Sequence, residues 1–292
     1  MSQAIVSDRA RYLSLAPAGS FLVALTLLPL ANLVWLSFFH VEWSAGHQDR
    51  SFVGLANYLR LGGDSLFLAG IVNTIIFVLA STGAQVAIGL ALALLCSRIG
   101  RYSRIYRTLL LLPILIPGII IGAIWRLMYN FQFGIINQAL AGFGIEPLDW
   151  LGSPSLALLS VILVDIWHWT PFSFLLLLVA VENLPGDVSE AARIDGASAW
   201  QEFRNVTFPM LLPAIVVTFA FRAIIALKVF DEIYLLTGGG PGTATEVVSF
   251  TIYQRLFVQD DIGYGSAMSV AVIFIVGIVI AAVLTRRRGV PG

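Results

Sequence analysis

Few residues in this 292-residue sequence could perform chemistry, and most of them stand inside or beside long apolar stretches. Asn73, Asp165 and Arg222 are surrounded by Leu, Ile, Val, Ala and Phe, and Gln85 and Lys228 have similar surroundings. An amide or ionisable side chain in an apolar medium is costly unless it is paired or hydrated. These residues are therefore candidates for contact with a polar solute.

Each of these side chains also has a structural alternative. The alternatives are hydrogen bonds between helices for Asn73 and Gln85, an ion pair between Asp165 and Arg222, and an ion pair one turn apart between Lys228 and Glu232. Both interpretations stay open at the level of the sequence.

The sequence offers no cluster for metal or covalent chemistry. His40, His47 and His168 do not form a group, and His168 is better explained as a packed or interhelix-bonded residue. Cys96 is the only cysteine, which excludes an intramolecular disulfide and a cysteine-based metal site. We therefore predict no catalytic residue and no metal site, which argues against an integral membrane enzyme.

The composition indicates a membrane setting. The chain is 58% hydrophobic and 12% charged, whereas a soluble domain is about 45–50% apolar and about 25% charged. A helix that crosses the hydrocarbon core needs about 20 apolar residues. Six stretches are long enough, namely 15–39, 71–96, 105–129, 156–181, 208–229 and 266–285. The first is too long for the apolar region of a cleaved signal peptide.

These stretches predict an all-α integral membrane protein with six transmembrane helices in a single domain over residues 1–292, since only helices satisfy the backbone within lipid here. The formal net charge of zero argues against nucleic-acid binding.

The arginines predict the orientation, because short cytoplasmic loops collect Lys and Arg. With the N-terminus inside, eleven arginines lie on the inner side and three in outer loops. The inner ones are Arg9, Arg11, Arg98, Arg101, Arg104, Arg107, Arg193, Arg204, Arg286, Arg287 and Arg288, and the outer ones are Arg50, Arg60 and Arg255. Both termini are thus expected in the cytoplasm.

One polar insert separates the fourth and fifth apolar stretches. The Pro-Gly pair at 185–186 ends the preceding helix. Asp187 with Glu190, and then Ser198 with Gln201, give two capping signals with a glycine between them. We expect two short helices with a bend, whose alanines and mixed charges favour docking of a protein over contact with anionic lipid.

The spacing within this insert is specific. Glu190-Ala191-Ala192 is followed after three residues by Gly196, and nine further residues lead to Val206 and then to Phe208-Pro209. This pattern resembles the EAA motif of permease subunits of binding-protein-dependent ABC importers, although Val206 and Phe208 replace Ile and Leu. In that family the motif forms the coupling helix that sits on the ATP-binding subunit. The resemblance implies a cytoplasmic coupling loop over 184–207, with Glu190, Ala191, Ala192, Asp195 and Gly196 as its coupling residues.

Two further segments narrow the resemblance to permeases of the sugar and glycerol-phosphate type. They are Phe-Asp-Glu-Ile-Tyr-Leu-Leu-Thr-Gly-Gly-Gly-Pro-Gly at 230–242 and Phe-x-Gly-Leu-x-Asn-Tyr at 52–58. The resemblance implies that an outer loop containing Gly238, Gly239, Gly240 and Pro241 contacts a solute-binding protein.

The resemblance also implies the assembly: a type I ABC importer that works by alternating access in the bacterial inner membrane. The implied partners are a second homologous permease, two ATP-binding subunits, an extracytoplasmic solute-binding protein and the lipid bilayer. The chain has no Gly-x-x-x-x-Gly-Lys-[Ser/Thr] loop. ATP and Mg are therefore expected on the partner ATPase, with no cofactor on this chain.

A carbohydrate-type solute is the expected cargo, because aromatic rings suit the apolar face of a sugar and nearby polar groups suit its hydroxyl edge. The predicted pathway residues are Asn73, Trp125, Tyr129, Asp165, Trp169, Arg222, Phe230, Asp231 and Glu232. Polyols, glycerol phosphodiesters and sulfonated sugars remain alternative solutes. An autonomous secondary transporter is a further alternative, but its usual paired repeats are not found.

Overall fold

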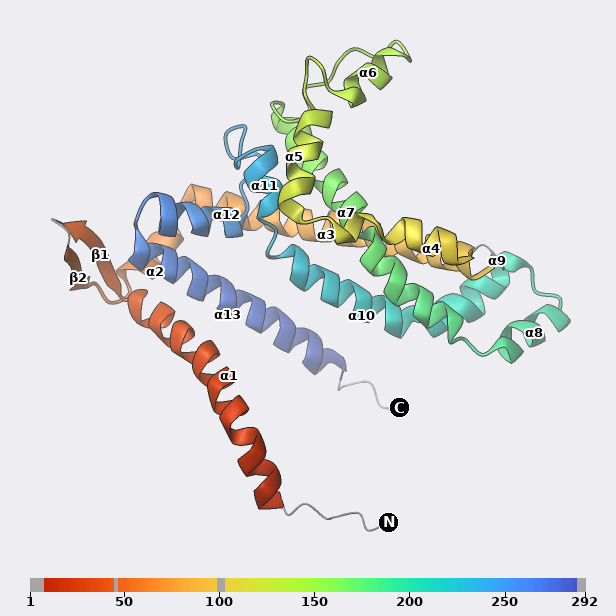
Figure 1. Cartoon of the computed structure of the whole chain (residues 1–292), viewed down its shortest axis with the longest axis horizontal. Helices are drawn as coiled ribbons and strands as arrows, with labels where there is room; N and C mark the ends of the chain where they lie inside the picture. Colours follow the sequence, from red (N-terminus) through yellow and green to blue (C-terminus); the bar gives the residue numbers. More distant parts are fainter. Residues whose placement is uncertain (1–7, 45–46, 99–102, 288–292) are drawn as a thin grey trace. The chain divides into compact units, whose positions relative to one another are not determined.

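The computed structural model describes residues 8–44, 47–98 and 103–287 (Figure 1). The described residues group into two compact units. One contains the chain up to Asp64 together with the chain from Ile252 onward, and the other is Ser65–Thr251. Arg101 and Arg288, which contributed to the predicted orientation, lie outside the described residues.

The regular secondary structure in the described part of the Ser65–Thr251 unit is entirely helical. Its elements are α3 (Ser65–Arg98), α4 (Ser103–Leu111), the 3-10 turn η1 (Pro113–Leu115), α5 (Gly118–Met128), α6 (Ile135–Ala141), α7 (Pro154–Glu182), α8 (Gly186–Ile194), α9 (Ala199–Glu202), the π-helical segment η2 (Phe203–Thr207), α10 (Phe208–Ala226), α11 (Asp231–Leu236) and the start of α12 (Val248–Tyr253). Two helices of this unit, α3 and α7, are long and apolar enough to cross a membrane, as is the continuous helix Ala199–Ala226.

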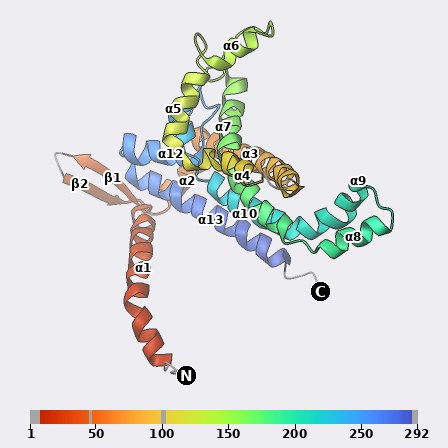
Figure 2. The same ribbon diagram turned by 45° about the vertical axis from the view of Figure 1, so that its right-hand side comes forward.

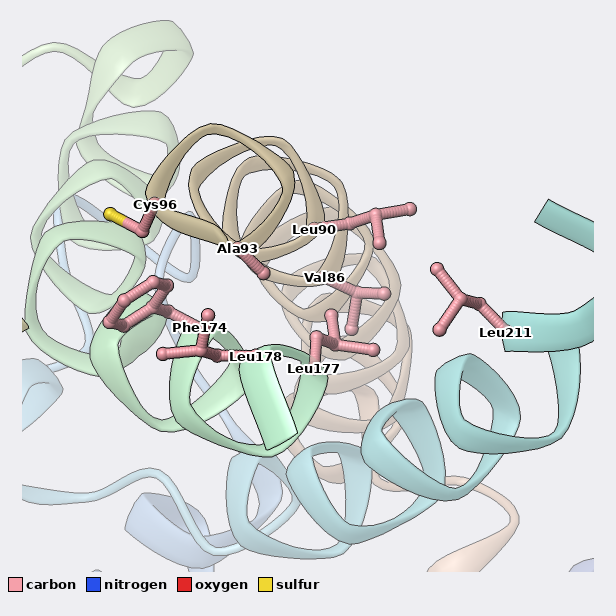
Figure 3. Packing of buried hydrophobic residues seen from close by; sticks show 8 residues of the cluster. All are labelled: Val86, Leu90, Ala93, Cys96, Phe174, Leu177, Leu178 and Leu211. Carbon is pink, nitrogen blue, oxygen red and sulfur yellow. The ribbon is translucent and has the colours of Figure 1, made fainter. Parts of the chain in front are cut away.

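The core of this unit lies between α3, α7 and α10. Figure 3 shows its buried side chains directed into the space between these helices; they are Val86, Leu90, Ala93, Cys96, Phe174, Leu177, Leu178 and Leu211. Gly89 lies where α3 meets α7, and a Cβ there would be 2.8 Å from the backbone nitrogen of Phe174. The two long helices can therefore approach this closely only because position 89 has no side chain.

The stretch 105–129 is not the single helix that was expected. It forms α4, η1 and α5 instead, because Pro113 and Pro117 interrupt it. Proline lacks a backbone N–H and disfavours the helical conformation at the residue before it. Ile116, before Pro117, accordingly has an extended backbone with φ −89° and ψ 127°, and α5 begins directly after Pro117.

The other unit begins with α1 (Asp8–Leu36), whose stretch Ala16–Leu36 is also long and apolar enough to cross a membrane. An antiparallel hairpin of β1 (Phe39–Ser44) and β2 (His47–Phe52) follows, with Phe39 opposite Phe52. The sequence did not predict this hairpin. Because β1 begins at Phe39, the first helix ends at Leu36, three residues earlier than expected. The unit continues with α2 (Ala56–Leu61) and is completed by the π-helical segment η3 (Gln254–Val258) and α13 (Ile262–Arg287).

The Phe-x-Gly-Leu-x-Asn-Tyr segment at 52–58 has a structural task in this unit. Asn57 is buried, and its Nδ2 donates to the carbonyl oxygens of Ser37 at 2.9 Å and Phe39 at 3.0 Å. The hydroxyl of Tyr58 lies 2.6 Å from the Ser37 hydroxyl. The segment therefore ties α2 to the end of α1 and the start of β1.

Candidate functional site

A pocket of about 150 Å³ opens in the Ser65–Thr251 unit beside α7, α10 and α11. Six of the nine predicted pathway residues line it: Asp165, Trp169, Arg222, Phe230, Asp231 and Glu232. Lys228 lines it as well, together with the apolar side chains of Ile225, Ala226 and Val229. The apolar members gave no signal in the sequence, because a residue that lines a pocket and one that faces lipid look alike in an apolar stretch.

A buried ion pair forms one wall of the pocket. Nη2 of Arg222 lies 2.5 Å from both carboxylate oxygens of Asp165, which confirms the ion pair considered from the sequence. Gln85 Nε2 donates to Asp165 Oδ2 and to its carbonyl oxygen, each at 2.8 Å. Two buried charges are stable together only when they are paired and bonded in this way. The pair and its amide partner join α3, α7 and α10.

Arg222 keeps donor capacity after this pairing. Its Nε and Nη1 are buried and have no hydrogen-bond partner in the described part of the chain. Its guanidinium lies over the ring of Trp169, with 4.9 Å between Cζ and the ring centroid, a cation–π arrangement. The pocket wall therefore combines an aromatic face with a buried guanidinium whose remaining N–H donors are enclosed by the protein.

A second buried pair brings one of its members, Glu232, to the pocket lining. Nδ1 of His168 is 3.3 Å from Oε1 of Glu232, and both side chains are more than nine-tenths buried. His168 is thus an interhelix-bonded residue, as expected. The alternative pairing of Glu232 with Lys228 is not found among the described residues.

Three predicted pathway residues lie elsewhere. Asn73 Nδ2 donates to the carbonyl oxygens of Thr243 at 2.8 Å and Glu246 at 2.9 Å, so it holds a loop. Trp125 and Tyr129 pack against each other with ring centroids 5.3 Å apart. The structure brings neither aromatic residue to the pocket lining.

The glycine-rich loop after α11 is internally bonded. The hydroxyls of Thr237 and Thr245 lie 2.6 Å apart, and Thr245 donates to the carbonyl oxygen of Gly240 at 2.8 Å. Gly239 has φ +86°, and a Cβ there would lie 2.9 Å from Phe250 Cε1. Together with Asn73, these bonds give Gly238, Gly239, Gly240 and Pro241 a fixed shape, and their contact with another protein stays a prediction.

The polar insert forms the bent pair of helices that was expected. Gly196 has φ +78° between α8 and α9, a conformation that favours glycine. Ser198 and Gln201 form the predicted capping box, in which Gln201 N donates to Ser198 Oγ at 3.4 Å and Ser198 N to Gln201 Oε1 at 2.8 Å. Asp187 is not the N-cap that was expected, because α8 already begins at Gly186. An acidic residue in the first turn still suits the helix dipole.

The insert presents apolar side chains to its surroundings. Ile194 is 86% exposed and Trp200 is 66% exposed, and Glu190, Ala191 and Asp195 are exposed beside them. The side chain of Arg193 lies outside the described residues. Figures 1 and 2 both show α8 and α9 at one end of the unit, beyond the ends of α7 and α10.

Comparisons with known proteins cover most of the chain. Residues 85–289 match the family described as "Binding-protein-dependent transport system inner membrane component". The trehalose/maltose transport system permease protein MalF of Thermococcus litoralis is 36% identical over 89% of this chain and 87% of its own length. The sulfoquinovosyl glycerol transport system permease protein SmoG of Agrobacterium fabrum is 35% identical over 94% and 88%. The trehalose transport system permease protein SugA of Mycobacterium tuberculosis is 34% identical over 93% and 86%.

The fold has a counterpart among solved structures. A chain of a bacterial ABC transporter involved in the import of the acidic polysaccharide alginate superposes with a TM-score of 0.82 and 23% sequence identity. The match covers 97% of both chains. A second structure, of a bacterial alginate ABC transporter in complex with an alginate-pentasaccharide-bound periplasmic protein, gives the same TM-score over 99% and 100% of the two chains.

Proposed function

The chain belongs to the family of inner membrane components of binding-protein-dependent transport systems, and on this premise we propose that it is the permease subunit of an ATP-driven importer for a carbohydrate-type solute. The exposed, bent insert of α8 and α9 supports this proposal most directly. It carries the Glu-Ala-Ala motif in α8 and Gly196 at the bend between α8 and α9. The apolar side chains of Ile194 and Trp200 are exposed there and could pack against a partner protein.

The insert is suited to transmit movement. From Ala199 to Ala226 the chain forms one continuous helix made of α9, η2 and α10. Lys228 and Phe230, which line the pocket, follow directly after this helix. A force on α9 therefore acts on the helix that carries Arg222. We infer that residues 184–207 dock on an ATP-binding subunit and that ATP and Mg are bound there.

The expected topology has six crossings with both termini in the cytoplasm of a bacterial cell. The four long apolar helices supply four crossings. The segment of α4, η1 and α5 supplies the broken third crossing, and α13, with a shorter apolar stretch over Ile262–Ile278, supplies the sixth. A second homologous permease would cover part of the exposed apolar surface of this chain, and lipid would cover the rest.

The pocket supports a hydroxylated solute. Trp169 and Phe230 offer aromatic faces, and the exposed Lys228 and Asp231 offer a donor and an acceptor for hydroxyl groups. The relatives named above transport trehalose, maltose or sulfoquinovosyl glycerol. Polyols, glycerol phosphodiesters and sulfonated sugars stay alternatives to this proposed solute class. The glycine-rich loop at 238–241 is the proposed contact of an extracytoplasmic solute-binding protein.

Reconstitution with the products of the neighbouring genes tests the proposal. A thermal-shift screen of the encoded solute-binding protein identifies the solute, and the labelled compound is then offered to proteoliposomes. We expect uptake only when this chain, the second permease, the ATPase, the binding protein and ATP are all present. Uptake by this chain alone, driven by an ion gradient, would show an autonomous secondary transporter instead.

A further inference from the structure

Helix α11 lies along one face of α5 (Figure 1). Gly118, Gly122 and Arg126 are spaced four residues apart and therefore share a face of α5. A Cβ at Gly118 would lie 3.0 Å from Asp231 Oδ2, and a Cβ at Gly122 would lie 2.8 Å from Leu235 Cβ. Arg126 Nη1 donates to the carbonyl oxygen of Leu235 at 3.2 Å. The contacts follow the same order along both helices, so the two helices run parallel.

Parallel helices bring like ends of their dipoles together, which is unfavourable unless charges compensate them. Here Asp231 lies in the first turn of α11 and against Gly118, the first residue of α5, so one carboxylate faces both N-terminal ends. Arg126, in the last turn of α5, bonds a carbonyl in the last turn of α11. The two side chains thus compensate both ends of the helix pair.

Helix α11 depends on its neighbours for its position. It has six residues, too few for a helix that is stable by itself. Its buried residues Glu232, Ile233 and Leu236 fix it by packing, and the missing side chain at Gly122 allows its backbone to approach α5 closely. The contacts that determine the position of α11 therefore also determine where Asp231 and Glu232 lie in the pocket.

We propose that Gly122 and Arg126 are positioning residues that fix α11 and so place the pocket carboxylates, and that α5 and α11 move as one body. The consequence for solute transport rests on the function proposed above. The pairing of the two helices does not, and it is open to a test that needs no solute.

A cysteine pair reports the pairing. A Cβ at Gly118 would lie 3.4 Å from the Cβ of Asp231, close to the spacing of about 3.5–4.5 Å in a disulfide. The full chain carries Gly118→Cys and Asp231→Cys in a Cys96→Ser background, which removes its only native cysteine. The purified complex is oxidised with copper phenanthroline, and closure is followed as loss of free thiols, with each single-cysteine chain as control. Rapid closure of the pair alone is expected, and closure no faster than random collision overturns the proposal.

Substitutions in this background test the positioning residues. Gly122→Ala and Arg126→Gln should each slow closure by about fivefold or more, the factor that corresponds to roughly 1 kcal/mol of displacement. Ile119→Ala, at an exposed position of the same helix, should leave the rate unchanged. Arg126→Lys keeps a donor and should restore most of the rate. Equal rates in all four chains would remove the positioning role.

The movement is tested on the assembled complex. Closure is compared without nucleotide and with ATP plus orthovanadate, which holds the ATPase in its closed state. One body predicts equal rates in the two states, and a rate that falls severalfold in one of them shows that α5 and α11 separate. If no ATPase assembles with the chain, the proposed function fails, while the nucleotide-free closure still decides the helix pairing.

Discussion

Asp165 and Arg222 illustrate how one residue pair can be both structural and functional. Their charges are buried, and removing one partner leaves the other unpaired at a cost of about 3–5 kcal/mol. We expect Arg222→Gln to lower the unfolding temperature of the detergent-solubilised chain strongly. The double variant Asp165→Asn, Arg222→Gln should recover part of the loss. Lys228→Gln, at an exposed pocket position, is the control and should have little effect. Additive losses in the double variant would contradict the pairing.

The sequence left two roles open for Asn73, contact with the solute and a structural hydrogen bond, and one variant distinguishes them. Asn73→Ala removes two hydrogen bonds to the loop backbone, each worth about 1 kcal/mol. If the glycine-rich loop contacts the solute-binding protein, the affinity of that protein for the complex should fall, while the solute KM at saturating binding protein stays unchanged. Both are measured in proteoliposomes, with Asn183→Ala as a control that loses only a local bond. Unchanged affinity with an altered solute KM would instead place Asn73 in the pathway.

The polar residues that line the pocket were predictable because a polar group in an apolar stretch is conspicuous. Asp165, Arg222 and Lys228 were found in this way, and the structure brings them to one pocket. Trp125 and Tyr129 were chosen by residue type alone, and an aromatic ring packs as readily into a helix interface as it lines a pocket. Their partners depend on which helices meet, and a single sequence does not state that.

At the scale of the helices, the contact of α3 with α7 depends on one glycine. A Cβ at Gly89 would press against the backbone of Phe174, whereas Gly83 on the same helix has nothing within 4 Å. We expect Gly89→Ala to destabilise the chain by about 1–3 kcal/mol through overpacking. Gly83→Ala should be neutral or slightly stabilising. The measurement is the unfolding temperature in detergent, and equal temperatures for the two variants would refute the close approach.

The insert offers a test of docking against contact with lipid. Ile194 is 86% exposed, so a Cys at this position, in the Cys96→Ser background, can carry a photoreactive group without disturbing a core. In the assembled complex we expect the group to label the ATP-binding subunit. Labelling of lipid alone would support an interfacial helix and contradict the docking assignment.

The long apolar stretches predict α3, α7, α10 and α13 close to their observed bounds, because burial in lipid requires continuous apolar helix. The stretch 105–129 differs, because Pro113 and Pro117 break the apolar run into shorter helices. The hairpin of β1 and β2 was missed because its short strands have little apolar alternation, and η2 was missed because a π-helical turn has no sequence signature.

At the scale of the whole molecule, the pocket and the α8–α9 insert are separate parts of one unit, and the proposed function assigns the driving of transport to partner subunits. The Ser65–Thr251 unit contains both the pocket and the insert, linked by the continuous helix Ala199–Ala226. A substitution in the insert should therefore affect uptake without touching the pocket. We therefore infer that solute binding and coupling to ATP hydrolysis depend on separate parts of the chain.

The most direct test is the number of solute molecules imported per ATP hydrolysed by the reconstituted complex. Gly196→Ala forces an alanine into a left-handed conformation, a strain of about 1–2 kcal/mol that corresponds to a factor of roughly 5–30 in an equilibrium. Gly186→Ala is the control, since Gly186 has no left-handed backbone and no neighbour within 4 Å. We expect Gly196→Ala to lower the ratio severalfold and Gly186→Ala to preserve it, with solute affinity unchanged in both. An unchanged ratio in Gly196→Ala would contradict the coupling role of the insert.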